Sequence, residues 1–151
     1  MASLHLPETD HVVRLIKPSL LMRDESTNQV IGCFPEAFRL READHNRETE
    51  RDLSVSWLEF FSGSKIERLQ QVRNHAELAL SRNHGFACLN VGAIQRLCES
   101  LAIKVRILHE PTNGNPAHAA IHRYPRDQDE LFGLMANLAS EDLLLARDIP
   151  P

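Results

Sequence analysis

The chain has 151 residues, of which 42% are hydrophobic and 25% are charged. A chain of this length and composition buries a hydrophobic core as one globular domain, which excludes a disordered or fibrous protein. The formal net charge of −4 excludes the basic face that duplex DNA or RNA requires, so we expect no duplex nucleic acid as a partner.

The cysteines and the apolar runs bear on the cellular compartment. Cys33, Cys88 and Cys98 include no CxxC pair and lie among apolar neighbours, so we expect reduced, buried thiols. The N-terminus has no apolar run behind a basic start, and no other run approaches the length that spans a membrane. These features predict a cytoplasmic protein that does not bind a membrane.

The first forty residues predict a loose start followed by strands. Residues 1–10 are polar and lack periodicity, so we expect a loose N-terminal lead-in. Residues 11–17 are rich in β-branched side chains and stop at a proline, which predicts a strand that residues 20–22 extend. Residues 30–34 predict a second strand, and the alternation of residues 38–40 predicts its continuation.

Residues 41–52 hold three arginines and five acidic residues but no large apolar side chain. We expect none of these residues to be buried, so the segment predicts an exposed polar loop. The simplest interpretation is an insertion, and the alternative is a lid over a binding site.

An aromatic cluster follows this polar segment. Residues 53–57 alternate apolar side chains with serines, as a half-buried strand does. Trp57, Phe60 and Phe61 then mark either a corner of the core or a recognition surface. We favour the core, because burying a ring of this size contributes about 1.5 to 3 kcal/mol.

Capping signals predict the helices on either side of the centre of the chain. An S-x-x-E capping box at Ser64 predicts a helix that continues to about residue 81. Residues 127–130 repeat this pattern ahead of an amphipathic run that ends near residue 139. A further cap at Ser140 predicts a second short helix over residues 143–145.

The centre of the chain predicts a strand, a helix and a second strand. Residues 86–91 form an apolar run next to glycines, which is typical of a buried strand. Apolar side chains then recur at helical spacing over residues 93–101, and residues 105–109 alternate as a strand does. The connection is short, so the two strands need not be immediate neighbours in the sheet.

Residues 116–123 are compatible with two structures. Asn115 before Pro116 is typical of a helix N-cap followed by proline at the first helical position. The preceding turn signal at residues 112–114 indicates instead a hairpin, with residues 116–123 as its second strand. We favour the strand.

Together these elements predict one α+β domain over residues 1–151. We expect a mostly antiparallel sheet of five or six strands, with two or three amphipathic helices packed on it. No internal repeat, low-complexity tract or linker divides the chain.

His118 and His122 are candidate ligands of a metal ion. On a helix, two histidines four residues apart lie close enough to share a metal ion. On a strand they are roughly 13 Å apart, at about 3.3 Å for each residue, and cannot complete one coordination sphere. Because we favour the strand, we expect no metal and no cofactor.

A metal-free catalytic site is the alternative use of these histidines. The predicted hairpin places His109 opposite His118 or close to it, with His122 on the same strand as His118. One imidazole as acid and one as base, with Arg106 and Arg123 as substrate-binding residues, would suit phosphodiester chemistry. The simpler interpretation is that histidines beside a turn are partly exposed and have no special role.

Asn90 and Gly92 are candidate substrate-binding residues of a second kind. They lie where a predicted strand turns into a helix, and the amide groups of a helix N-terminus bind anions. A single glycine is far less specific than a complete phosphate-binding motif.

Two functions follow from these observations. The first is a small cytoplasmic binding or accessory protein that acts through protein–protein interaction, with another protein or a second copy of itself as partner. The alternative is an enzyme that acts on nucleotide or RNA phosphate through the histidines and arginines of residues 106–123. We favour the binding protein, because no complete catalytic motif occurs.

Overall fold

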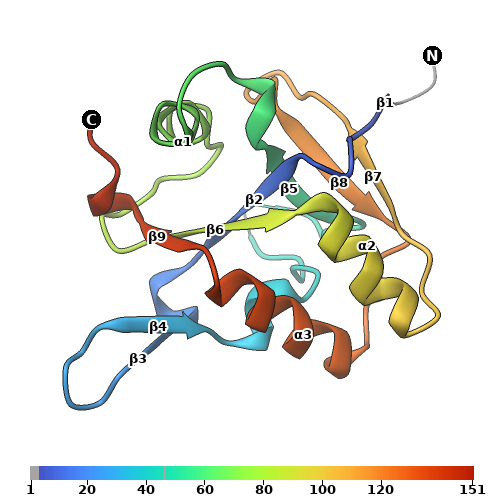
Figure 1. The fold of residues 1–151 in the computed structure, drawn as a ribbon, viewed down its shortest axis with the longest axis horizontal. Helices are drawn as coiled ribbons and strands as arrows, with labels where there is room; N and C mark the ends of the chain where they lie inside the picture. The colour runs from blue at the N-terminus through green and yellow to red at the C-terminus, as the bar shows by residue number, and fades with distance from the viewer. Residues whose placement is uncertain (1–3, 46) are drawn as a thin grey trace.

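The computed structural model describes residues 4–45 and 47–151, which form one α+β domain (Figure 1). The strands in the described residues are β1 Leu4–His5, β2 His11–Ile16, β3 Leu21–Arg23, β4 Val30–Cys33, β5 Leu53–Trp57, β6 Gly85–Asn90, β7 Arg106–His109, β8 His118–His122 and β9 Leu143–Leu145. The helices there are α1 Lys65–Asn74, α2 Val91–Ser100 and α3 Asp129–Ser140, with short 3-10 turns at Pro18–Leu20, Pro35–Phe38, Leu58–Phe60 and Ala146–Asp148. None of the helices in the described residues is long and apolar enough to cross a membrane.

Seven of the described strands form one sheet in the order β1-β7-β8-β5-β2-β6-β9. Every pair of neighbours in this sheet is antiparallel. Strands β3 and β4 form a separate hairpin, which extends to the lower left in Figure 1. The α+β class and the antiparallel sheet are therefore as predicted, and the sheet is larger than the five or six strands expected.

Helices cover both faces of the sheet. Alternate side chains of β2 enter different cores, because successive residues of a strand point to opposite faces. Val12 and Ile16 join the larger core with α2 and α3, whereas Val13 joins the smaller core with α1. Figure 1 shows α2 and α3 beside each other and α1 apart from them. Burial on both faces explains why β6 is a nearly continuous apolar run.

Two edge strands come from segments that were expected to have other structures. Residues 1–10 are predicted to be a loose lead-in, yet β1 pairs with β7 and the Leu6 amide donates to the Ile107 carbonyl at 3.0 Å. That prediction is wrong for residues 4–10, and residues 1–3 lie outside the described part. Residues 143–145 are predicted to be helical but pair with β6 as strand β9. In both cases an open sheet edge satisfies backbone groups that the local pattern does not account for.

Two element boundaries also differ from the prediction. Residues 38–40 do not extend a strand, because Pro35–Phe38 is a 3-10 turn with proline at its start. Helix α1 has the predicted capping box at Ser64 but ends at Asn74, well before residue 81. Beyond that point Ala76 and Ala79 have only small side chains, which bury too little apolar surface to hold further turns.

The central strand–helix–strand unit is confirmed as β6, α2 and β7. Strands β6 and β7 run in the same direction, with β2, β5 and β8 between them, as the short connection led us to expect. Residues His118–His122 form strand β8 and not a helix. This strand pairs with β7 on one side and β5 on the other, so its backbone is hydrogen-bonded on both sides.

Candidate functional site

The three candidate catalytic histidines do not converge. His109 pairs with Ala119 across the β7–β8 hairpin, so it lies on the opposite sheet face from His118 and His122. Its Nε2 donates to the Pro116 carbonyl at 2.8 Å. His109 was expected opposite His118 or close to it, and the register places it one residue from that pairing. The two backbones are close, but the side chains point to opposite faces of the sheet.

His118 and His122 share a sheet face and both contact Glu110. The Nδ1 of His118 is 2.8 Å from the main-chain oxygen of Glu110, and the Nε2 of His122 is 2.8 Å from its carboxylate. The Nδ1 of His122 also lies 3.4 Å from the carboxylate of Asp52. Two carboxylates thus flank His122, and their charge opposes the binding of a phosphate there.

The two candidate arginines are both exposed at one end of the β7–β8 hairpin. Arg106 is exposed and pairs with His122 in the register of the hairpin. Arg123 is exposed beyond the end of β8, where its backbone has a φ of 62°. Both arginines therefore lie next to His122, Arg106 across the hairpin and Arg123 along the chain, and His122 is the histidine flanked by carboxylates.

The predicted anion site at Asn90 and Gly92 is already filled by the protein's own groups. The amide of Gly92 donates to the Glu8 carbonyl at 3.0 Å, and the amide of Val91 donates to the Asp10 carbonyl at 2.9 Å. Asn90 caps helix α2 through its Oδ1 and donates through Nδ2 to the same two carbonyls. The docked N-terminal segment therefore uses the first amide groups of α2, which are the groups that an anion would need.

A seam divides the sheet between β2 and β5. The two strands pair at two successive positions and then diverge. Side chains replace the missing strand contacts, since Arg14 Nη1 donates to the Ser54 carbonyl at 2.8 Å. The Ser54 amide donates to Glu50 Oε2, also at 2.8 Å. The seam is therefore closed at this point by a pair of charged side chains.

In the Arg14–Glu50 pair, Glu50 is buried, Arg14 is partly buried, and both side chains are well hydrogen-bonded. The two side chains are 3.1 Å apart, and Glu50 is 6% exposed. The other carboxylate oxygen of Glu50 accepts the Arg41 amide at 2.7 Å, and Arg14 Nε donates to the Ala37 carbonyl at 3.1 Å. Burial raises the pKa of Glu50, but the charge of Arg14 and the amide hydrogen bonds outweigh it and lower the pKa overall.

The seam opens into a cleft of about 1050 Å³, which we name the central cleft. It is lined by residues 13–20, 36, 37, 39–42, 54–56 and 76–79, together with Arg47, Glu50, His84, Asn115 and His118. Apolar side chains such as Leu15, Val55 and Leu78 lie among them. Charged side chains of both signs also line it: Arg14, Lys17, Arg39, Arg41 and Arg47, with Glu36, Glu42, Glu50 and Glu77.

One part of the central cleft is polar and closely hydrogen-bonded. Asn115 and Ser56 are buried there, and Asn115 Nδ2 donates to Ser56 Oγ at 3.2 Å. Asn115 Oδ1 accepts the Ala117 amide at 3.1 Å. Because Ser56 pairs with His118 across strands β5 and β8, these groups place the imidazole of His118 beside the seam.

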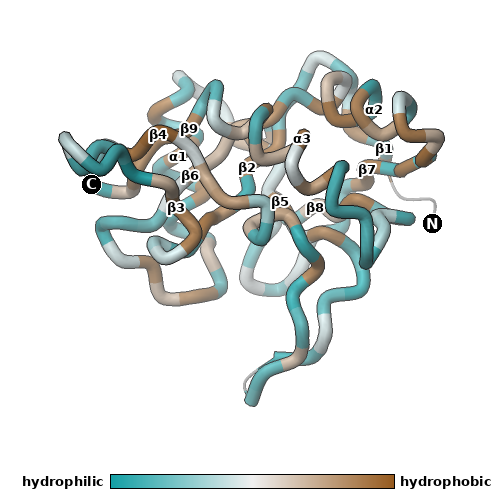
Figure 2. The backbone as a smooth tube through the Cα atoms, turned by 90° about the horizontal axis from the view of Figure 1, so that it is seen from below, coloured by the Kyte–Doolittle hydropathy of each residue, from teal (hydrophilic) through white to brown (hydrophobic). Residues whose placement is uncertain are grey.

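Residues 41–52 form an arm that makes one wall of the central cleft. The Glu50 amide donates to the Arg41 carbonyl at 2.8 Å, which closes the base of the arm. Figure 2 shows the arm reaching away from the sheet as a mostly hydrophilic segment. Most of its described residues are exposed as predicted, but the expectation that none is buried is wrong for Glu50. The buried acid is stable because Arg14 neutralises it.

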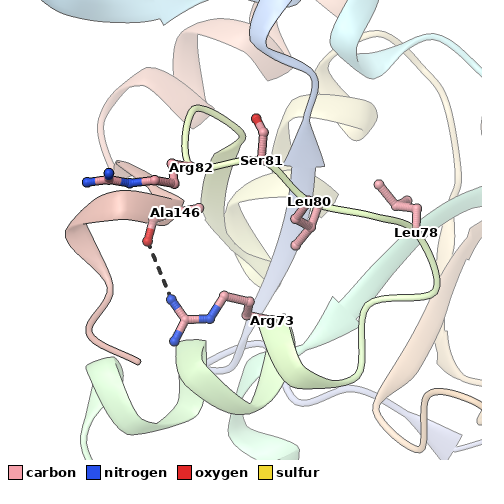
Figure 3. A pocket seen from close by; sticks show the side chains of 6 residues that line it. All are labelled: Arg73, Leu78, Leu80, Ser81, Arg82 and Ala146. Atoms are coloured by element: carbon pink, nitrogen blue, oxygen red, sulfur yellow. Dashed lines mark hydrogen bonds between the residues drawn. The ribbon is translucent and has the colours of Figure 1, made fainter.

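A second, smaller pocket lies between the end of α1, residues 78–82 and the C-terminal turn (Figure 3). Its volume is about 280 Å³. Arg73 on one side is a structural clamp, since its guanidinium donates to the carbonyls of Ala146, Ile149 and Pro150. Leu78 lines both this pocket and the central cleft.

The aromatic cluster lies at the surface more than we expected. Leu58 is the buried residue of this segment, whereas Phe60 is 40% exposed. Trp57 is half-buried, and its ring centroid lies 5.1 Å from that of His109. The preference for the core is wrong for Phe60, because the 3-10 turn after β5 directs it outward.

Sequence reasoning identified only His118 among the residues of the central cleft. It missed Arg14 and Glu50, because a single charged residue in a strand or a polar loop carries no sign that it is paired. It also missed His84, because a lone histidine after a helix carries no sign that it lines a cleft. No family model, curated protein or solved structure matches this chain.

Proposed function

We propose that this protein binds a protein partner and that an extended polypeptide segment of the partner occupies the central cleft. The observation that carries the proposal is the cleft itself, about 1050 Å³ in volume and lined by apolar and charged side chains together. Clefts with an apolar surface and a few fixed polar groups are typical ligand-binding sites.

The charges of the cleft support a polypeptide over a phosphate ligand. Arginine and glutamate side chains alternate along the wall made by the arm, as at Arg41 and Glu42. A phosphate site concentrates positive charge, whereas a polypeptide carries both signs and apolar side chains. The mixed lining therefore suits a polypeptide.

The positions of the three histidines argue against an enzyme that acts on phosphate. His109 lies on the other face of the sheet from His118, and carboxylates flank His122. A general acid and a general base must both reach the same substrate atoms. The described residues provide no such pair among the three histidines.

A cytoplasmic location belongs to the same proposal. Cys33, Cys88 and Cys98 are unpaired and buried. Burial raises the pKa of the Cys33 and Cys98 thiols to about 11, so these thiols stay protonated and unreactive. Free buried thiols are usual in a reducing compartment.

The test is a selection for linear peptides followed by a cleft-blocking variant. Random dodecapeptides displayed on phage are selected against the wild-type protein, and affinities of the enriched peptides are measured by fluorescence anisotropy. Ala79 is exposed and lines the cleft, so Ala79→Arg should weaken binding at least about tenfold. Ala43→Arg is the matched control, because Ala43 is an exposed alanine that does not line the cleft. Failure to enrich any peptide, or equal binding to both variants, would contradict the proposal.

A further inference from the structure

We infer that His84 and His118 hydrogen-bond to the main chain of the bound polypeptide, His84 as the donor and His118 as the acceptor. This inference rests on the proposed function and names how the central cleft holds its ligand. Both residues line the cleft. Within the described residues, neither Nε2 atom has a hydrogen-bond partner, so both are left for a ligand.

The hydrogen bonds of His84 place its proton on Nε2. The main-chain amide of Ser81 donates to Nδ1 of His84 at 2.9 Å. An amide group is only a donor, so Nδ1 must hold a lone pair and the proton of the neutral ring lies on Nε2. Burial lowers the pKa of His84, and the nearby charge of Lys17 adds to this, so the ring favours the neutral form. His84 therefore presents an N–H donor to the cleft.

The hydrogen bonds of His118 place its proton on the other nitrogen. Its Nδ1 lies 2.8 Å from the main-chain oxygen of Glu110. A carbonyl oxygen only accepts, so Nδ1 carries the proton and Nε2 of the neutral ring holds a lone pair. His118 therefore presents an acceptor, and the main chain of the protein sets the two rings in opposite tautomers.

One donor and one acceptor match a peptide main chain. Each peptide group of an extended segment provides an N–H and a C=O, which would bind His118 and His84 respectively. A phosphate or carboxylate provides acceptors only and would leave the lone pair of His118 unpaired. Main-chain contacts tolerate many side chains, so the apolar and charged walls of the cleft would select among sequences.

The test uses asparagine variants that keep each structural hydrogen bond. Asparagine Oδ1 occupies about the position of imidazole Nδ1, so His84→Asn keeps the acceptor for Ser81 and removes the Nε2 donor. His118→Asn keeps a donor for Glu110 through Nδ2 and removes the Nε2 acceptor. The probes are a peptide selected on the wild-type protein and its series of singly N-methylated forms. Each variant should bind the unmethylated peptide about two- to tenfold more weakly than the wild type does, which is the effect of losing one neutral hydrogen bond.

The N-methyl series separates a direct contact from a structural effect. In the wild-type protein, N-methylation at one position should weaken binding, because it removes the N–H that donates to His118. That loss should disappear in His118→Asn and persist in His84→Asn. His5→Asn, a change of an exposed histidine outside the cleft, should behave as the wild type does.

The outcomes distinguish this inference from the function on which it rests. If no peptide binds, or if Ala79→Arg binds as tightly as the wild type, the proposed function fails and this inference fails with it. If binding depends on Ala79 but neither asparagine variant changes it, the cleft binds polypeptides and only this inference is overturned. The inference would also be overturned if N-methylation of the peptide weakened its binding to His118→Asn as much as to the wild type. It would be overturned as well if both asparagine variants bound the peptide normally while their thermal unfolding matched the wild type.

Discussion

Replacing Glu50 with alanine should destabilise the protein by about 3 to 5 kcal/mol, the usual cost of removing one partner of a buried ion pair. The Glu50 carboxylate accepts from Arg14 and from the amides of Arg41 and Ser54. The alanine variant leaves all of these donors without that acceptor. The two amides alone account for about 2 to 6 kcal/mol, at about 1 to 3 kcal/mol for each unpaired buried group. The expected loss of about 3 to 5 kcal/mol is therefore reached even if water partly solvates Arg14.

The assay is urea denaturation followed by the fluorescence of Trp57, the single tryptophan of the chain. Glu48→Ala is the control, because Glu48 is an exposed acid of the same arm and should change stability by less than about 0.5 kcal/mol. Glu50→Gln keeps an acceptor but loses the charge, so its effect should lie between the two. A loss below about 1 kcal/mol in Glu50→Ala would refute the conclusion that this pair closes the seam.

Three further changes test other parts of the structure. Because the folded pKa of Glu50 is lowered, its stabilising effect is present above the ordinary value of 4.5 and is lost as the pH falls through the folded value. Urea midpoints of Glu50→Gln should therefore fall less steeply below about pH 5 than those of the wild type, and parallel curves would contradict this. Ile107→Ala should cost about 2 to 5 kcal/mol, because Ile107 is 1% exposed in the larger core; an unchanged urea midpoint would show that β7 is not a core strand. Replacing residues 42–48 with a short glycine–serine linker should leave the thermal midpoint nearly unchanged, whereas replacing 41–52 should lower it clearly, and equal midpoints would argue against a role for the base of the arm.

Local sequence patterns determined where most elements begin. The capping box at Ser64 forms as predicted, with hydrogen bonds between residues three positions apart. The alternation of residues 53–57 predicted β5, and the turn signal at residues 112–114 predicted that β8 is a strand. These signals succeed because the interactions behind them, caps, turns and the direction of successive side chains, involve neighbours in the chain.

Only the tertiary structure decided which residues lie together at the central cleft. The register of the β7–β8 hairpin places His109 on the opposite face from His118, and a shift of one residue would have placed them on the same face. The sequence could not single out Glu50 among the five acids of the arm, since its partner Arg14 is 36 residues away. Strand β9 formed from a segment predicted to be helical, because β6 offered it an open edge. Register, edge pairing and buried charge pairs depend on contacts between distant segments, and a local pattern contains no information about them.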